Sequence, residues 1–239
     1  MKTLALAAAF ALLAGAAPAQ QVIRIGTEGA YAPYNFINDA GKLDGYEIEL
    51  GQEMCKRAAL TCEFVQNDWD TIIANLNSGN YDAVMAGMSI TPERKKDRLF
   101  TQAYTPPAVS LYVAASEEAD IKAGVIAAQV STIQAGHVAE TGAQLVEFAT
   151  PDETVAAVRN GEADAVLADA DYLAPIVAES NGELQVVGKV QLGEGVGAAL
   201  RMSDSALRDK FDAALTAMKQ DGSINTLITK WFGPEAPLF

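Results

Sequence analysis

Apolar and polar residues recur along the first third of the chain with the periods of strands and helices. Val22–Gly26 is a short β-branched run that predicts a strand, and Glu47–Leu60 has the apolar spacing of an amphipathic helix. Cys62–Gln66 predicts a second strand, and Trp69–Asn77 predicts a second helix. Strands that alternate with helices predict an α/β architecture with a mostly parallel sheet.

The chain contains an internal repeat. Residues 72–88 (IIANLNSGNYDAVMAGM) align without gaps on residues 154–170 (TVAAVRNGEADAVLADA), and both segments predict a helix, a glycine stop and an Asp-Ala-Val strand. We interpret the two copies as two similar lobes, and chance similarity in an alanine-rich sequence is the alternative. Gly87 and Asp169 take equivalent places at the carboxyl ends of the predicted strands, where ligands bind in open α/β sheets.

Two breaks in the pattern suggest where the lobes are joined. The prolines of Tyr104–Pro107 favour an extended path, and a second break lies around Gly188–Gly197. The predicted terminal helix, Ala206–Lys219, would then return to the first lobe. The expected organisation is lobe 1 from residues 20–107 and 191–239, with lobe 2 formed by residues 108–190. Two crossings between lobes predict a hinge and a cleft suited to closing over a small ligand.

The first residues predict an export signal rather than a part of the fold. Lys2 precedes an apolar run, Leu4–Ala17, and Ala17-Pro18-Ala19 supplies small residues for cleavage, so residues 1–19 are expected to be a signal peptide. The run is shorter than the roughly 20 residues that a bilayer needs. We therefore expect a periplasmic protein.

Charge and cysteine content narrow the class of protein. The formal net charge of -14 disfavours polyanionic partners, so no nucleic acid partner is expected. Cys55 and Cys62 are the only cysteines, and in an exported protein an even pair predicts a disulfide. A continuous helix would hold their Cα atoms about 10 Å apart, beyond the roughly 7 Å of a disulfide, so the helix must end near Leu60. Metal binding is the alternative, but two cysteines and His137 cannot complete a zinc site without distant carboxylates.

Five charged or hydroxyl positions are candidates for binding chemistry. Arg94 follows a Thr-Pro-Glu helix opening and could hold a carboxylate through two hydrogen bonds, although a solvated helix face is the alternative. Ser131 and Thr132 precede a predicted helix and could receive an anion, or simply cap that helix. An unpaired Asp169 in a buried strand would be costly, and a ligand ammonium would relieve the cost. Glu28 lies similarly at the end of the first strand.

Aromatic residues could form an apolar or cation-attracting wall beside these groups. Tyr31 and Trp69 lie next to predicted strands, and core packing is the alternative for each. The turn around Tyr31 makes core burial less expected for that residue. Catalysis has little support, because the sequence contains one histidine, no Gly-x-Ser-x-Gly elbow and no phosphate-binding glycine loop. We expect no enzyme and no cofactor, although carboxylates alone can perform acid–base chemistry.

Five segments together resemble the periplasmic polar-amino-acid-binding proteins of ABC importers (solute-binding protein family 3). They are GTEGAYAPYNF, GKLDGYEIELGQEMC, DWD, YDAVMAGMSITPER and DGSINTLITKWFG, and the resemblance spans nearly the whole mature chain. It is strongest to the lysine/arginine/ornithine, histidine and octopine/nopaline binders, and the cysteine spacing resembles the disulfide of the first group. The resemblance implies the two-lobed, type II periplasmic-binding-protein fold.

The resemblance also implies a role for each candidate. Arg94 would grip the ligand α-carboxylate, Asp169 would take the α-ammonium, and Glu28 would meet a cationic side chain. Tyr31 and Trp69 would sandwich the ligand side chain. The remaining expected ligand-binding positions, several of which offer amides or hydroxyls, are Ala86, Gly87, Met88, Ser89, Ser131 and Thr132. Cationic-amino-acid binders often have hydroxyl residues where this chain has Ala86 and Gly87.

The function that the resemblance implies is a monomeric receptor. It would close on one polar, cationic amino acid and deliver it to a membrane ABC permease/ATPase complex. Two alternatives stay open. The TEGAYAP segment with Trp69 is more similar to opine binders. Cyclohexadienyl dehydratases are enzymes on the same fold, and Glu28 would be the general acid.

Overall fold

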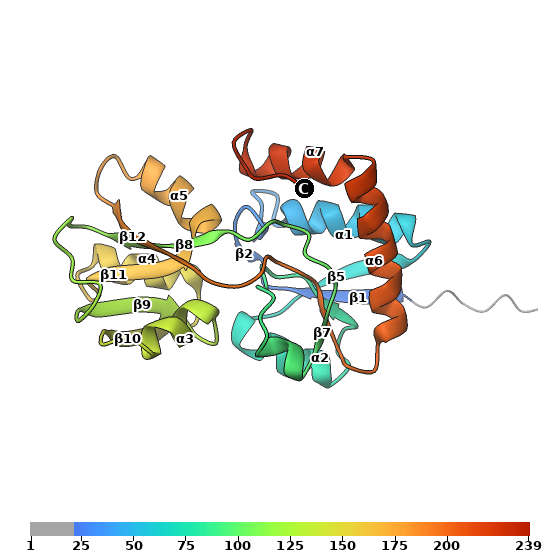
Figure 1. Ribbon diagram of the computed structural model, residues 1–239, viewed down its shortest axis with the longest axis horizontal. Helices are drawn as coiled ribbons and strands as arrows, with labels where there is room; N and C mark the ends of the chain where they lie inside the picture. Colours follow the sequence, from blue (N-terminus) through green and yellow to red (C-terminus); the bar gives the residue numbers. More distant parts are fainter. Residues whose placement is uncertain (1–21) are drawn as a thin grey trace, which may run out of the picture.

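Two five-stranded sheets divide the chain into two bodies, which stand side by side in Figure 1. The computed structural model describes residues 22–239, so the predicted signal peptide lies outside the described residues. We call the body with sheet β5-β1-β6-β13-β7 lobe 1 and the body with sheet β10-β9-β11-β8-β12 lobe 2. The predicted two-lobed α/β architecture is confirmed.

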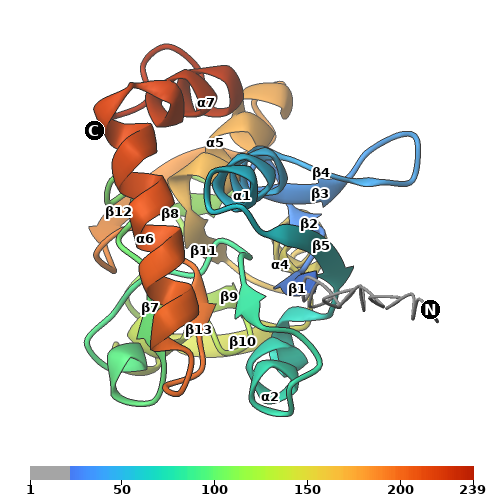
Figure 2. The ribbon, with the colours of Figure 1, turned by 90° about the vertical axis from the view of Figure 1, so that its right-hand side faces the viewer.

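The sheet of lobe 1 is covered by helices on both faces. Residues of strand β6 and the turn after it alternate, so Ala83 and Met85 face one apolar cluster while Val84 and Ala86 face another. Helices α1, α6 and α7 pack together, and Figure 2 shows α6 along one side of the lobe. The elements of lobe 1 are β1 (Val22–Thr27), β2 (Ala30–Tyr31), β3 (Asn35–Ile37), β4 (Leu43–Asp44), α1 (Tyr46–Arg57), β5 (Thr61–Gln66), the 3₁₀ turn η1 (Trp69–Thr71), α2 (Ile72–Asn77), β6 (Ala83–Val84), the 3₁₀ turn η2 (Arg94–Lys96), β7 (Leu99–Phe100), β13 (Ala199–Leu200), α6 (Ser205–Gln220) and α7 (Ser223–Phe232).

Lobe 2 repeats this plan with its own helices. Leu111 and Val113 of strand β8 face one apolar cluster, and Tyr112 faces the cluster on the opposite side of the sheet. The elements of lobe 2 are β8 (Val109–Ala114), β9 (Val125–Gln129), α3 (Ile133–Ala139), β10 (Gln144–Phe148), α4 (Pro151–Arg159), β11 (Ala165–Asp169), α5 (Ala170–Glu179) and β12 (Gln185–Gln191).

The strands of the two repeated segments, β6 and β11, take equivalent positions in the two sheets. Strands β6 and β11 are both central, each with a parallel neighbour on one side and an antiparallel neighbour on the other. Gly79 and Gly161 follow the two repeated helices with left-handed φ angles of 77° and 75°, as a C-cap glycine should. The repeat is therefore structural and not a chance similarity.

The expectation of mostly parallel sheets is confirmed, because four of the five strands in each sheet run in the same direction and one strand, β13 in lobe 1 and β8 in lobe 2, is reversed. In lobe 1, β1 is parallel to β5 and β6, whereas β13 is antiparallel to β6 and β7. In lobe 2, β9 is parallel to β10 and β11, whereas β8 is antiparallel to β11 and β12. A helical crossover makes neighbouring strands parallel. The chain enters β8 and β13 directly from the other lobe, without such a crossover.

Two extended segments, residues 101–108 and 192–198, connect the lobes. They pair with each other through a bridge between Thr105 and Val196, and the Tyr104 amide donates to the Val196 carbonyl at 2.8 Å. Gly195 allows this close approach, because a Cβ there would lie 2.7 Å from the Thr105 carbonyl oxygen. The second break was predicted to start at Gly188, which instead lies inside β12 at a register shift.

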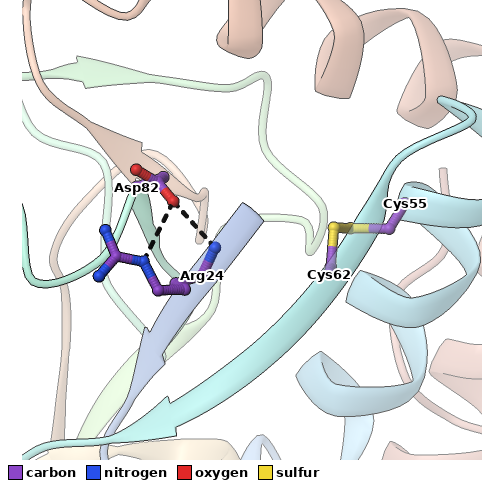
Figure 3. The surroundings of a disulfide bond; sticks show 4 residues. All are labelled: Arg24, Cys55, Cys62 and Asp82. Carbon is purple, nitrogen blue, oxygen red and sulfur yellow. Dashed lines mark hydrogen bonds and ion pairs between the residues drawn. A yellow bond between two sulfur atoms is a disulfide. The ribbon is translucent and has the colours of Figure 1, made fainter. Parts of the chain in front are cut away.

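The predicted disulfide is confirmed. Cys55 in the last turn of α1 bonds to Cys62 in β5, with 6.2 Å between their Cα atoms (Figure 3). The helix ends at Arg57, three residues earlier than expected, and the chain turns back through Ala59 with a φ of 52°. The bridge therefore joins the end of a helix to the next strand.

Strand β1 is tied to the loop before β6 beside this bridge. The Arg24 amide donates to the Asp82 carboxylate at 2.9 Å, and the Arg24 guanidinium lies 3.7 Å from the same oxygen (Figure 3). This pairing joins the start of β1 to the loop before β6. It lies at the opposite end of β1 from the carboxyl end that leads into Glu28.

Candidate functional site

A small cavity lies between the two lobes. Its walls are built from the carboxyl ends of strands β1, β9 and β11, the segment after β6, and the first residues of η1 and α3. We call it the interlobe cavity. Its lining residues are Glu28, Tyr31, Trp69, Ala86, Gly87, Ser89 and Arg94 from lobe 1, and Gln129, Thr132, Ile133, Gln134 and Asp169 from lobe 2.

Most of the residues singled out in the sequence come together here, and two do not. Met88 is buried in the core of lobe 1, because alternation along its segment turns it away from Gly87 and Ser89. Ser131 lies outside the lining, and its backbone has a φ of 59°. Its carbonyl oxygen accepts a hydrogen bond from Arg94 at 3.2 Å, so it acts on the cavity through that arginine.

Sequence reasoning missed Gln129, Ile133 and Gln134. Gln129 is the last residue of β9, which takes the place in the sheet of lobe 2 that β1, the strand leading into Glu28, takes in lobe 1. This equivalence follows from the strand order and not from a sequence motif. Ile133 and Gln134 occupy the first turn of α3, directly after the Thr132 cap.

Arg94 is presented by a single turn of 3₁₀ helix and not by the longer helix that was expected. The Arg94 amide donates to the Thr91 hydroxyl at 3.1 Å, which holds the Thr-Pro-Glu opening against the turn. The turn ends within three residues because Leu99 and Phe100 join the edge of the sheet.

The Arg94 guanidinium is fixed by neutral groups from both lobes. It donates to the Ser89 carbonyl at 2.9 Å and to the Ser131 carbonyl, and it lies 5.8 Å from the Trp69 ring centre. Burial and the neighbouring Arg98 lower its pKa to about 10, which leaves it cationic at neutral pH. Within residues 22–239, no carboxylate lies within ion-pair distance of this guanidinium.

Asp169 faces Arg94 from lobe 2 and has hydrogen bonds but no cation. Its carboxylate accepts from the Tyr31 hydroxyl at 2.9 Å and from the Gln134 amide at 2.8 Å, with the Ser110 hydroxyl at 3.4 Å. Burial raises the pKa of Asp169 to about 6, although the Tyr31 hydrogen bond opposes the shift. Neutral donors therefore satisfy this carboxylate without neutralising its charge.

Glu28 is a second buried carboxylate on the cavity wall. Its side chain accepts from the Gln129 amide at 2.6 Å, across the lobes, and only 6% of the residue is exposed. Burial raises the pKa of Glu28 to about 7, and the carboxylates of Asp68 and Asp152 add to the shift. Among the residues described, no lysine or arginine forms an ion pair with it.

Two aromatic rings complete the walls. The Trp69 indole donates to the Val130 carbonyl at 2.9 Å, which is another contact between lobes. Tyr31 stacks on Tyr172, with ring centres 4.7 Å apart and planes 15° apart. The expectation that the Tyr31 turn escapes core burial is wrong, because lobe 2 covers the turn and leaves 8% of the residue exposed.

Gly87 lines the cavity without offering it a hydrogen-bond donor. Its amide donates to the Glu47 carboxylate at 2.8 Å, so the amide is engaged behind the wall. Glu47 is fully buried and also accepts from Asn35 at 2.7 Å and from the Tyr104 hydroxyl. Gly87 has a φ of 62°, and a Cβ there would lie 3.1 Å from the Tyr31 ring.

Two kinds of site, a metal centre and a membrane span, can be tested on the residues that the structure describes. Across residues 22–239, no cluster of three or more His, Cys, Asp or Glu side chains could hold a metal ion. None of the helices between these residues combines the length and apolarity needed to span a bilayer.

Comparison with known proteins places this architecture and site in context. The family of bacterial extracellular solute-binding proteins, family 3, matches residues 23–234. The histidine-binding periplasmic protein of Salmonella typhimurium is 32% identical, and the alignment covers 97% of each chain. The L-arginine-binding protein of Pseudomonas aeruginosa is 31% identical, also over 97% of each chain.

Solved structures share the fold over most of the chain. A periplasmic His/Glu/Gln/Arg/opine family-binding protein from Silicibacter pomeroyi, in complex with lysine, is 66% identical with a TM-score of 0.89. The match covers 91% of this chain and 100% of that chain. An ancestral amino acid-binding protein, described as a precursor of cyclohexadienyl dehydratase, is 30% identical with a TM-score of 0.79 and covers 88% of this chain and 95% of that one.

Proposed function

The chain belongs to the bacterial extracellular solute-binding proteins, family 3, and on that premise we propose that it is a receptor for a cationic α-amino acid. The receptor would lie in the periplasm after export by residues 1–19 and would deliver its ligand to a membrane ABC transporter. The histidine- and arginine-binding relatives are periplasmic proteins by name, which supports this location.

The charge pattern of the interlobe cavity carries the proposal. Arg94 is a cation with no anionic partner, and Asp169 and Glu28 are carboxylates with no cationic partner in the described chain. An α-amino acid with a cationic side chain has the complementary set of charges, one anion and two cations. Arg94 would bind the α-carboxylate, Asp169 the α-ammonium, and Glu28 the side-chain cation.

The position of these groups makes closure depend on the ligand. Arg94 comes from lobe 1 and Asp169 from lobe 2, so the head group of the amino acid would bridge the two lobes. A ligand favours the closed form only through contacts that it does not make in the open form. The lysine complex of the 66% identical neighbour supports the same class of ligand.

The experiment is a thermal-shift screen of residues 20–239 with calorimetric confirmation. Lysine, arginine, ornithine and histidine are compared with glutamine, glutamate and octopine. A ligand at 100 times its dissociation constant adds about 2.7 kcal/mol to the free energy of unfolding, a shift of several degrees. We expect stabilisation by the cationic amino acids. Stabilisation by octopine or neutral amino acids alone would retain the receptor and reject the role of Glu28.

An arginine variant tests the anchor itself. Arg94→Ala is expected to weaken binding of every α-amino acid by a factor between about ten and several hundred. The reason is that the buried ligand carboxylate loses its charged partner. Lys96→Ala is the matched control, because its side chain is 69% exposed on the same turn. Near-normal affinity in a folded Arg94→Ala protein would show that the anchor lies elsewhere.

A second candidate function is a dehydratase on the same scaffold. The pKa of Glu28, raised to about 7, suits a general acid, and one structural neighbour is the ancestor of such an enzyme. Prephenate and arogenate are the substrates to test with the purified protein. Turnover that disappears in Glu28→Gln would establish the enzyme, and a lack of turnover would reject it.

A further inference from the structure

A second cavity, of about 240 Å³, lies at the hinge. We call it the hinge cavity. It shares no lining residue with the interlobe cavity. Its walls come from three places: the first crossing segment, the start of α5 in lobe 2, and the end of α7 with the chain that follows it. In Figure 1 these two helices lie on the same side of the crossing segments. The lining residues are Thr105, Pro106, Pro107, Ala108, Val109, Ala170, Asp171, Ile228, Phe232, Ala236 and Pro237.

The hinge cavity contains a buried hydroxyl without a hydrogen bond. Thr105 is 5% exposed, and its hydroxyl has no partner of normal geometry within the described residues. It lies close enough to the Tyr34 hydroxyl to lower the pKa of that tyrosine. The Tyr34 proton, however, is donated to Asp171 at 2.8 Å. A buried polar group left in this state is unfavourable, and a ligand donor would satisfy it.

The only charged side chain of the lining is a carboxylate. Asp171 accepts the Tyr34 hydroxyl through one oxygen, and no lysine or arginine in the described part of the chain pairs with it. The rest of the lining is apolar apart from Thr105, with Val109, Ile228 and Phe232 as its largest side chains. This composition is that of small-molecule sites, which are mostly apolar with a few convergent polar groups.

We propose that the hinge cavity is a second ligand site, which binds a small amine with an apolar body. The ammonium group hydrogen-bonds to the Asp171 carboxylate and the Thr105 hydroxyl, and the apolar body packs against Val109 and Phe232. An α-amino acid is excluded, because its carboxylate would lie in an apolar cavity whose one charged group is also negative.

Occupancy of this site is coupled to closure of the lobes. Asp171 belongs to lobe 2 and Phe232 to lobe 1, so a bound amine contacts both lobes in the closed arrangement. Such a ligand favours the closed form, which, on the basis of the proposed function, is the form that binds the amino acid. By linkage, each ligand then strengthens the affinity for the other by the same factor.

Calorimetry with 2-phenylethylamine as the probe tests the site, and 3-phenylpropionate is the anionic control of similar shape. We expect the amine to bind and the acid not to bind. Asp171→Asn and Thr105→Val should each weaken amine binding by about tenfold. Amine binding is measured without an amino acid present, and lysine binding without the amine, which separates failure of this proposal from failure of the proposed function.

Three results would overturn the proposal. They are the absence of amine binding at millimolar concentrations, equal binding of the acid, and insensitivity of amine binding to both hinge variants in protein shown to be folded by circular dichroism. A final titration measures lysine affinity with and without saturating 2-phenylethylamine. A tighter lysine dissociation constant supports the coupling, and an unchanged one removes the coupling from the proposal.

Discussion

The charged residues of the interlobe cavity are held by neutral partners. Gln129 orients Glu28, Tyr31 and Gln134 orient Asp169, and backbone carbonyls orient Arg94. Neutral hydrogen bonds fix the side chains without cancelling their charges. Charges that remain uncompensated in a buried site are available to a ligand of opposite charge, at the expense of the stability of the ligand-free protein.

Glu28→Gln should stabilise the ligand-free protein at high pH. Burial raises the pKa of Glu28 from 4.5 to about 7, so the folded state disfavours the charged form. Ionisation of Glu28 therefore lowers the free energy of unfolding of the wild-type protein. This loss is absent below pH 4.5, grows as the pH rises toward 7, and is constant above that, on the order of 3 kcal/mol. We expect a higher melting temperature for the variant at pH 8 and no difference at pH 4. Equal melting temperatures at pH 8 would contradict the burial argument.

The same variant should change how lysine affinity depends on pH. A side-chain cation binds the ionised form of Glu28, so wild-type affinity should fall as the pH drops from 8 to 6 and the carboxylate gains a proton. Glu28→Gln should bind lysine more weakly at pH 8 and lose most of this dependence. The measurement is calorimetry across that pH range. Asp169, whose pKa is about 6, contributes the remaining slope in both proteins. An unaltered pH profile in the variant would place the lysine side chain away from Glu28.

At the scale of elements, the disulfide acts on stability and not on binding. Cys55 and Cys62 are separated by 7 positions, and neither residue lines a cavity described above. Loop entropy predicts that the Cys55→Ser, Cys62→Ser double variant has a free energy of unfolding lower than that of wild type by about 2–3 kcal/mol. Denaturant unfolding measures this loss, with reduced wild-type protein as the control. Lysine affinity should be unchanged, and a large loss of affinity would mean that the bridge also positions the site.

Elements with strong local signals were predictable, and contacts between lobes were not. The helix at Tyr46–Arg57 and the repeated helix–glycine–strand units follow from periodicity and C-cap glycines, which act over a few residues. The antiparallel strands β8 and β13 depend on how the chain passes between lobes, which no local pattern encodes.

The same distinction applies within the site. Asp169 was predictable because a charge at the end of a buried strand is conspicuous, and Arg94 because it follows a Thr-Pro-Glu opening. Gln129 and Gln134 carry no charge, and their partners lie far away in the sequence, with Gln129 and Glu28 separated by 101 positions. The burial of Tyr31 likewise depends on Tyr172 in the other lobe, which covers it only after the chain has folded.

At the scale of the whole molecule, hydrogen bonds between groups of the protein itself hold the two lobes together. Trp69 donates to Val130 between the lobes, and Tyr34 donates to Asp171 at the hinge. Each such bond stabilises the closed form against the open one, whatever ligand is present. The affinity for a ligand that binds the closed form is reduced by the fraction of protein that is not closed. Interlobe hydrogen bonds therefore change the affinity for every such ligand by the same factor. The residues that line the interlobe cavity determine how the affinities for different ligands differ.

Tyr34→Phe isolates this common factor. Tyr34 does not line the interlobe cavity, and its hydroxyl donates to Asp171 in the other lobe. Loss of one hydrogen bond worth about 1 kcal/mol should weaken binding of lysine and arginine by the same factor of about five. Tyr81→Phe is the matched control, because the Tyr81 hydroxyl donates to Ile72 within lobe 1. That control should lower thermal stability and leave affinity unchanged.

Calorimetry gives the affinity ratio, and small-angle scattering of the ligand-free protein gives its radius of gyration. The Tyr34→Phe protein should be more open than wild type, with an unchanged ratio of lysine to arginine affinity. A changed ratio would mean that Tyr34 acts on the ligand and not on closure. An unchanged affinity would mean that the bond to Asp171 does not favour the closed form, and the lobes would then be held by the cavity residues alone.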